Sequence, residues 1–287
     1  MKIWGILNIT PDSFSDGGQN LSLEKAIQKV KDMIAAGVEV VDIGAESTRP
    51  GATPLNWRNE WDRLKEILPA ISQECRANNV LVSLDSYKPN TVSKALPYID
   101  IINDVSGLTS KEMIAVVRES SLPTVLMHSL SVPANASITI DPKVDVIKTV
   151  LNWFDHQVSY LIDNNVAQNQ IIIDPGIGFG KTQKQSKTIL ANIKRFQEFG
   201  LPILIGHSRK KFLRQNITEI TNTEVDWNTA LLSGYLATKG VDYIRVHNVA
   251  LNLALIDLYS CLVSDANNSS SGLVSYVQNY FELEVIN

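Results

Sequence analysis

The chain has 287 residues, of which 44% are apolar and 20% charged, and 26 basic against 30 acidic side chains give a net charge of −4. This apolar content suffices for a sizeable core and excludes a disordered or fibrous chain, while the mild acidity gives no general attraction to nucleic acid or to an anionic membrane. Only two cysteines occur, Cys75 and Cys261, without a CxxC motif, which excludes a disulfide framework and a cysteine-rich zinc site and favours a reducing compartment.

The first residues do not resemble a signal peptide, because the short apolar run after Lys2 soon reaches the polar residues Asn8 and Thr10. No apolar stretch approaches the roughly 18 residues that a membrane span needs. We therefore expect a cytoplasmic protein.

Short apolar, β-branched runs recur along the chain, and most lack polar alternation, as is typical of parallel strands buried on both faces. The predicted strands are residues 3–7, 38–43, 80–84, 99–102, 124–127, 170–173, 203–205 and 243–246. Between them, apolar residues at spacings of three and four predict helices. The predicted helices are residues 23–36, 57–78, 111–120, 143–164, 186–199, 227–239 and 248–262.

Eight strands that alternate with helices predict an α/β protein, a single (β/α)8 TIM barrel with eight parallel strands. An open doubly wound sheet is the alternative, and it is less favoured because eight such units are seldom found in one small open sheet. We expect the barrel over residues 1–263. The polar composition after that point predicts a linker, so residues 264–287 are expected to end in a short helical segment packed on the barrel.

Polar or ionisable residues stand at or just after the end of every predicted strand. They are Asn8, Asp42, Asp85, Asn103, His128, Asp174, Ser208, Arg245 and His247. In a barrel the carboxyl ends of the strands meet at one mouth, where the active sites of this fold lie. One such residue alone is more often a loop cap, but together they predict a polar ligand in the mouth.

The loops after the strands indicate what kind of ligand the mouth binds. Residues 10–18 and 46–51 are rich in hydroxyl groups and glycine, which suits lids that close over an anion. Segment 174–182 contains a Gly-Lys-Thr, but its spacing is one residue short of a phosphate-binding P-loop, and Lys181 stands where a dinucleotide motif needs its third glycine. The basic residues after Gly206 follow the seventh strand, where this fold commonly binds anions.

The reactive side chains show no familiar catalytic or metal-binding pattern. The four histidines lack metal-ligand spacing, and no Ser-His-Asp or Cys-His pairing is indicated. A mechanism without a covalent enzyme nucleophile is therefore favoured. A local excess of positive charge is expected at the mouth, from Arg49, Lys181, Arg209, Lys210, Arg245 and His247.

Several segments, in order and correctly spaced, together resemble the dihydropteroate synthases of folate biosynthesis, a family of pterin-binding TIM barrels. The matching segments are residues 5–18, 42–52, 83–88, 102–107, 174–181, 206–210 and 245–247. The resemblance implies a homodimeric transferase that needs Mg²⁺ and takes small-molecule substrates. Such enzymes join p-aminobenzoate to (7,8-dihydropterin-6-yl)methyl diphosphate and release 7,8-dihydropteroate and pyrophosphate.

The resemblance also implies a role for individual residues. Asn8 is expected to help hold Mg²⁺. The expected catalytic residues are Asp85, Asp174, Lys210 and Arg49. The residues expected to bind the pterin diphosphate are Thr48, Asp85, Asn103, Asp174, Lys210, Arg245 and His247. Those expected to bind p-aminobenzoate are Phe179, Lys181, Ser208 and Arg49.

The chain departs from the family pattern in two places. The segment after the fifth strand reads Met127-His128-Ser129-Leu130-Ser131, and Asn248 stands where an aspartate is more usual. Two alternatives stay open. One is a pterin-dependent methyltransferase acting with a corrinoid protein, although it has no use for Ser47-Thr48-Arg49 or a diphosphate site. The other is a catalytically silent paralogue that binds pterin.

Overall fold

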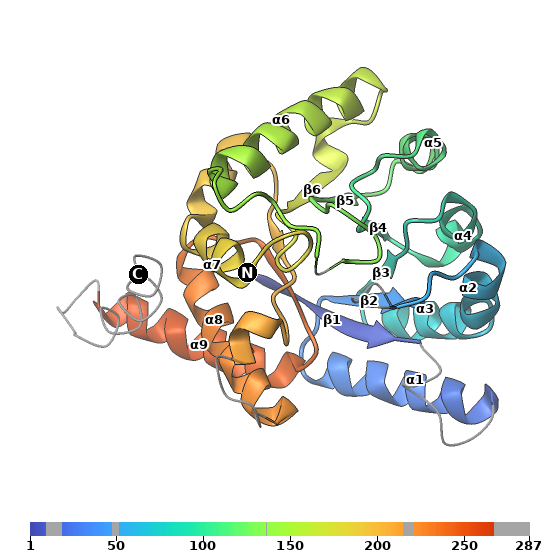
Figure 1. Ribbon diagram of the computed structural model, residues 1–287. Helices are drawn as coiled ribbons and strands as arrows, with labels where there is room; N and C mark the ends of the chain where they lie inside the picture. Colours follow the sequence, from blue (N-terminus) through green and yellow to red (C-terminus); the bar gives the residue numbers. More distant parts are fainter. Residues whose placement is uncertain (10–18, 48–51, 136, 215–220, 267–287) are drawn as a thin grey trace.

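The computed structural model describes residues 1–9, 19–47, 52–135, 137–214 and 221–266. Over these residues eight strands form one parallel sheet in the order β6-β5-β4-β3-β2-β1-β8-β7. An isolated parallel bridge between Ile173 and Ile203 brings β7 beside β6, so the sheet curls into a nearly closed barrel surrounded by helices (Figure 1). The predicted TIM barrel is confirmed, and the open doubly wound sheet is wrong.

The strands lie close to their predicted positions, and four of them (β1, β3, β4 and β6) end on a polar residue. They are β1 (Lys2–Asn8), β2 (Val40–Gly44), β3 (Leu81–Asp85), β4 (Ile101–Asp104), β5 (Thr124–Met127), β6 (Ile171–Asp174), β7 (Leu204–Ile205) and β8 (Tyr243–Val246). The α-helices are α1 (Gln19–Ala35), α2 (Trp57–Leu64), α3 (Ile67–Ala77), α4 (Pro89–Ala95), α5 (Lys111–Ser120), α6 (Val146–Asp163), α7 (Gln183–Ala191), α8 (Asn222–Thr238) and α9 (Val249–Ala266).

Helix boundaries differ from the prediction where local chemistry overrides the apolar period. The single helix expected at 57–78 is two helices, because Pro69 has no N–H to donate to the carbonyl of Lys65 and is tolerated only in the first turn of α3. Helix α8 begins at Asn222, earlier than expected, because Thr221 and Glu224 form a capping box. Similarly, the helix expected at 186–199 ends as an α-helix at Ala191 and continues as a 3-10 helix over Ile193–Phe199.

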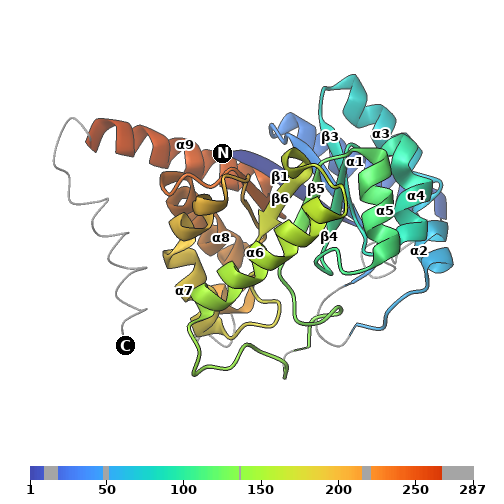
Figure 2. The same cartoon turned by 90° about the horizontal axis from the view of Figure 1, so that it is seen from above.

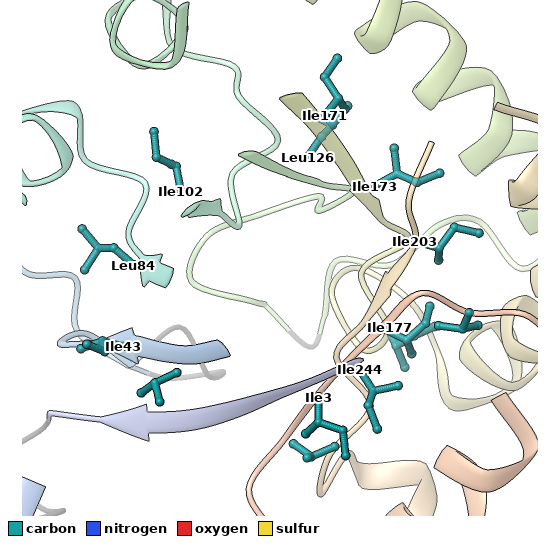
Figure 3. Packing of buried hydrophobic residues seen from close by; sticks show 14 of the residues in the cluster. Ile3, Ile43, Leu84, Ile102, Leu126, Ile171, Ile173, Ile177, Ile203 and Ile244 are labelled. Carbon is teal, nitrogen blue, oxygen red and sulfur yellow. The ribbon is translucent and has the colours of Figure 1, made fainter. Parts of the chain in front are cut away.

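Side chains along each strand point alternately to the outside and the inside of the barrel, which divides the core into two layers. Outward-facing side chains pack against the helices, and Figure 3 shows several of them pointing away from the barrel interior, among them Ile43, Leu84 and Ile102. The intervening residues face inward. At the amino-terminal end of the strands these form a separate apolar cluster that fills the barrel, made of Trp4, Val40, Ile101, Val125, Ile172 and Leu204, with Tyr243 packed against it. The apolar floor leaves only the opposite end of the barrel for polar chemistry.

Three carboxylates at the amino-terminal ends of the strands bind backbone N–H groups of neighbouring strands. Glu39 accepts from Ile3 N at 2.7 Å. Asp100 accepts from Val82 N and Asp242 from Ile203 N, each at 2.8 Å. Each acid satisfies a donor that the parallel ladder leaves unpaired, so this face of the barrel serves stability.

We expect Asp100→Ala to lower the free energy of unfolding by about 2 kcal/mol, because the buried Val82 N–H loses a charge-assisted acceptor. Urea unfolding measures the effect. Asp62→Ala is the control, since Asp62 is exposed and pairs with Lys65 on the surface, and such pairs contribute about 0.5 kcal/mol. Equal losses in both variants would contradict this role for Asp100.

Helices α8 and α9 lie side by side at one edge of the barrel in both views (Figures 1 and 2). Helix α9 continues through Ala266, past residue 263 where the barrel was expected to end. The rest of the predicted linker and terminal segment lies outside the described residues. Along the part of the chain that the structure describes, every helix is too short or too polar to cross a membrane.

Candidate functional site

The inward-facing residues at the carboxyl ends of the strands are polar, in contrast to the apolar floor. Asp85 of β3 pairs in register with Asn103 of β4, and Asp174 ends β6 beside Met127 of β5. Asn8 ends β1, opposite Gly44 of β2. The structure therefore brings these predicted site residues to one mouth, because adjacent parallel strands end at the same edge.

Arg245 of β8 lies between two carboxylates inside the barrel. Its Nε donates to Asp42 Oδ2 and its Nη2 donates to Asp85 Oδ2 at 2.6 Å. Burial of the Arg245 guanidinium opposes its charge, but the two carboxylates outweigh this and raise its pKa. Burial also raises the pKa of the Asp85 carboxyl, against the pull of Arg245. The guanidinium is thus held in the barrel wall beside the predicted pterin residues.

Asp174 anchors the loop that follows β6. Its Oδ1 accepts the Gly176 N–H at 2.7 Å, and only 5% of the residue is exposed. Burial raises the pKa of the Asp174 carboxyl to about 6, opposed by the Gly176 N–H and by the charges of Lys210 and Lys181. At neutral pH Asp174 is therefore mostly a carboxylate that accepts hydrogen bonds.

Lys210 and Phe179 meet across the loops after β6 and β7. The Lys210 ammonium lies 4.2 Å from the centre of the Phe179 ring, a cation–π contact. These two predicted residues, one assigned to pterin and the other to p-aminobenzoate, are therefore neighbours. The contact joins the loop after β6 to the loop after β7.

Lys181 turns inward and is only 6% exposed. Its ammonium contacts His128 Nδ1 at 2.8 Å and donates to the carbonyls of His128 and Phe179 at 3.2 and 3.0 Å. Burial lowers the pKa of His128 to about 3, so this ring is neutral and accepts at Nδ1. Three protein acceptors surround Lys181, which joins the loops after β5 and β6.

Ser208 and His247 form the rim beside β7 and β8. The Ser208 Oγ lies 2.9 Å from His247 Nδ1 and accepts the His247 backbone N–H at 3.1 Å. Asn248, the unusual residue after His247, accepts the Leu251 N–H at 3.1 Å and so caps the start of α9. Asn248 therefore caps the helix as an aspartate would, and Ser208 holds the histidine.

Arg209 does not belong to the cationic mouth, and this expectation is wrong. Its guanidinium makes two hydrogen bonds to Asp226 of α8, at 2.7 and 2.8 Å. His207 is fully buried, with Nε2 2.9 Å from Ser233 Oγ of the same helix. Alternate residues after β7 thus hold α8, while Ser208 and Lys210 meet residues of the mouth.

The loop after β2 is anchored by a buried ionic cluster that the sequence did not single out. Glu46 pairs with Lys88, accepts the Tyr87 hydroxyl at 2.9 Å and accepts the Leu55 N–H at 3.1 Å. Lys88 also lies 3.6 Å from buried Glu60. This cluster joins the two described ends of the segment that carries Thr48 and Arg49, which themselves lie outside the described residues, as does the predicted lid at 10–18.

Asp42 is the other site residue whose role was missed. The sequence pattern places it at a strand end but indicates no ligand and no partner for it. An aspartate inside an otherwise apolar strand needs a partner, and that was the available signal. Nothing in the sequence indicated that the partner is Arg245.

Known proteins match this chain over most of its length. The family model described as "Pterin binding enzyme" matches residues 4–247. The chain is 37% identical over 264 residues to dihydropteroate synthase from Streptococcus pyogenes serotype M3, which covers 91% of this chain and 95% of that protein.

Two solved structures extend the likeness to the fold. Dihydropteroate synthase from Anaplasma phagocytophilum with bound 6-hydroxymethylpterin-monophosphate has a TM-score of 0.81 at 35% identity, covering 91% of this chain and 99% of that one. The Xanthomonas albilineans enzyme with 4-aminobenzoic acid has a TM-score of 0.83 at 28% identity, covering 91% and 92%.

Proposed function

The chain belongs to the family of pterin-binding enzymes, and from this premise we propose that it is a dihydropteroate synthase joining (7,8-dihydropterin-6-yl)methyl diphosphate to p-aminobenzoate. It is a transferase, like its relatives. The observation that carries the proposal is the set of hydrogen-bonding groups at the mouth. Asp85, Asn103 and Asp174 offer acceptors to the amino and ring N–H groups of a pterin, and Lys210 donates to its oxygen and ring nitrogen.

The reaction breaks the bond between the pterin methylene carbon and the diphosphate oxygen and forms a carbon–nitrogen bond to the arylamine. Pyrophosphate leaves with the bonding electrons, and the arylamine nitrogen loses a proton. Because an arylamine is a weak nucleophile, stabilisation of the leaving group matters most. We propose a dissociative substitution in which Asp85 and Asp174 stabilise positive charge on the methylene carbon.

The departing anion is assigned to the rim and the p-aminobenzoate to the adjoining loops. His247 contacts phosphate oxygens, and the ionised Arg245 contributes positive charge. Phe179 and Ser208 line the p-aminobenzoate site, while Lys181 shapes it through the Phe179 carbonyl. Thr48 and Arg49 are assigned, by resemblance, to the reacting ends of both substrates.

Mg²⁺ is proposed as the cofactor, with the Asn8 side-chain oxygen as its protein ligand. Within the described residues no three acidic, histidine or cysteine groups gather into a metal site. An amide oxygen at the mouth fits Mg²⁺, which commonly takes one or two protein oxygens and completes its shell with substrate phosphates and water. The ion neutralises charge on the leaving pyrophosphate when bound.

The test is direct turnover. The protein is incubated with the pterin diphosphate, p-aminobenzoate and Mg²⁺, and dihydropteroate and pyrophosphate are measured; equal amounts of both are expected. Tight pterin binding without either product would identify a silent paralogue. Methyl transfer to a corrinoid protein in place of condensation would identify the methyltransferase.

Activity should depend on the ionisation of Asp174. Since the protonated carboxyl cannot accept at both oxygens, kcat/KM is expected to rise as the pH increases through about 6. For stability the sign is opposite: the folded pKa is raised above its ordinary value of 3.8, so this residue's contribution is present below that value and is lost as the pH rises through about 6. A pH profile flat between 5 and 8 would contradict the role of the carboxylate.

A cytoplasmic homodimer is also proposed, with the contact on α8 and α9. These helices expose three large apolar side chains, Trp227 (51%), Leu231 (39%) and Leu258 (53%). Exposed apolar surface is unfavourable in water, and a second copy of the chain would bury it. Sedimentation of Trp227→Glu is expected to show monomers. Ile162→Glu, which changes an exposed residue of α6, is the control and should stay dimeric.

A further inference from the structure

Asp42 of β2 lies one layer below the mouth, where three other strands each contribute one partner to its carboxylate. It is completely buried. Its Oδ1 accepts the Ser83 hydroxyl of β3 at 2.6 Å, and Asn103 Nδ2 of β4 lies 3.2 and 3.3 Å from its two oxygens. Arg245 of β8 donates to its Oδ2. Two of the three partners are therefore predicted pterin-binding residues.

Stability alone does not explain a charge at this position. A buried carboxylate loses hydration worth several kcal/mol, and apolar residues of similar size often replace buried ion pairs without loss. The layer beneath is apolar, so an apolar residue here would extend the floor. What Asp42 adds is orientation of the groups above it.

The carboxylate determines which way the Asn103 amide faces. An ionised carboxylate only accepts hydrogen bonds, so the amide must turn Nδ2 toward Asp42 and is left with Oδ1 as its acceptor. The same carboxylate takes Nε of Arg245, which directs Nη2 to Asp85. One buried group thereby sets the polarity of two neighbours.

We infer that Asp42 is a positioning residue that makes the mouth selective for a ligand edge rich in N–H donors. With Asn103 Oδ1 held as an acceptor beside the Asp85 and Asp174 carboxylates, the acidic side of the site offers acceptors only. This assignment rests on the proposed function, in which that ligand is the pterin ring. It predicts that the site prefers a ring carrying an amino group to one carrying a carbonyl at the same position.

The test compares Asp42→Asn with Ser83→Ala, which removes one hydrogen bond to Asp42 but keeps its charge. Calorimetry measures binding of the pterin diphosphate and of its 2-oxo analogue, in which a carbonyl replaces the amino group. In Asp42→Asn the Asn103 amide can reverse, so pterin affinity should fall about 100-fold and the preference for pterin over the analogue about ten-fold. Ser83→Ala should change each less than about three-fold.

The KM for p-aminobenzoate should be unchanged in Asp42→Asn. A folded Asp42→Asn protein that keeps the wild-type preference overturns the inference, as does an equal loss of affinity for both ligands, because either result reduces Asp42 to a structural role.

Should Asp42→Asn fail to fold, hydrogen exchange of the Asn103 side-chain N–H₂ in the wild-type protein tests the inference. The Asn103 signal is assigned by its absence from the spectrum of Asn103→Asp. Slow exchange is expected, and exchange as fast as that of an exposed asparagine overturns the inference. This measurement needs no turnover. A protein that binds pterin without making dihydropteroate would therefore fail the proposed function while still testing Asp42.

Discussion

Asp174→Asn is expected to lower kcat/KM for the pterin diphosphate about 1,000-fold while leaving the fold intact. The asparagine keeps Oδ1, which can still accept the Gly176 N–H and hold the loop after β6. The other carboxylate oxygen becomes an amide nitrogen, so a donor faces the N–H groups of the ligand. A desolvated site that loses a matched acceptor in this way discriminates strongly, because buried polar groups are left unpaired.

Calorimetry measures the affinity for the pterin diphosphate, and steady-state kinetics measures the KM for p-aminobenzoate. Pterin affinity should fall, and the KM for p-aminobenzoate should change little. Asp155→Asn, an exposed position of α6, is the matched control for loss of one negative charge and should behave as wild type. A variant that binds pterin normally would show that Asp174 serves only the loop.

The second large effect is expected from a glycine in the same loop. Gly176 has a φ of +67°, and a Cβ added there would lie 2.0 Å from the His128 carbonyl oxygen. Neither backbone can move without displacing the segments that carry Asp174 and Lys181. Gly176→Ala should therefore reduce stability by more than about 4 kcal/mol and abolish activity, because positive φ and a backbone clash act together.

Gly200→Ala separates these two causes. Gly200 has a similar φ of +62°, but an added Cβ there would meet nothing within 4 Å. Its substitution should cost only the backbone strain, about 1 kcal/mol. Urea unfolding compares the two variants, and equal losses would show that the close approach of the loops after β5 and β6 contributes little.

The location of the site was predictable because it depends on short-range regularity. A parallel strand buried on both faces has a run of apolar residues in the sequence. The polar residue that ends the run lies at the mouth. Asp85, Asn103 and Asp174 followed from this rule, and the structure brings them together. Helix boundaries were less predictable, since they turned on single residues such as Pro69 and the Thr221 cap.

Side-chain partners could not be predicted in the same way. Lys181 and Arg209 were both expected to add positive charge at the mouth. Lys181 is instead buried beside His128, and this burial lowers its pKa to about 7, while Arg209 pairs with Asp226. Arg209 and Lys210 are consecutive in the segment after β7, yet they have different surroundings, because a local reversal of the chain with a φ of +56° at Arg209 directs its side chain toward α8.

The sequence by itself determined the eight-unit barrel, the mouth where its polar strand ends gather, and membership of the pterin-binding family. Only the tertiary structure decided the hydrogen-bonding polarity of that mouth. Arg245 meets Asp42 and Asp85 across 203 and 160 positions of chain, and Asn103 meets Asp42 across 61. The Arg245 pairings require β8 to lie beside β1, and the Asn103 pairing requires β3 to lie between β2 and β4. The local pattern of apolar and polar residues indicates which side chains face inward. The partner of each inward-facing side chain depends on how all eight strands are arranged in the barrel.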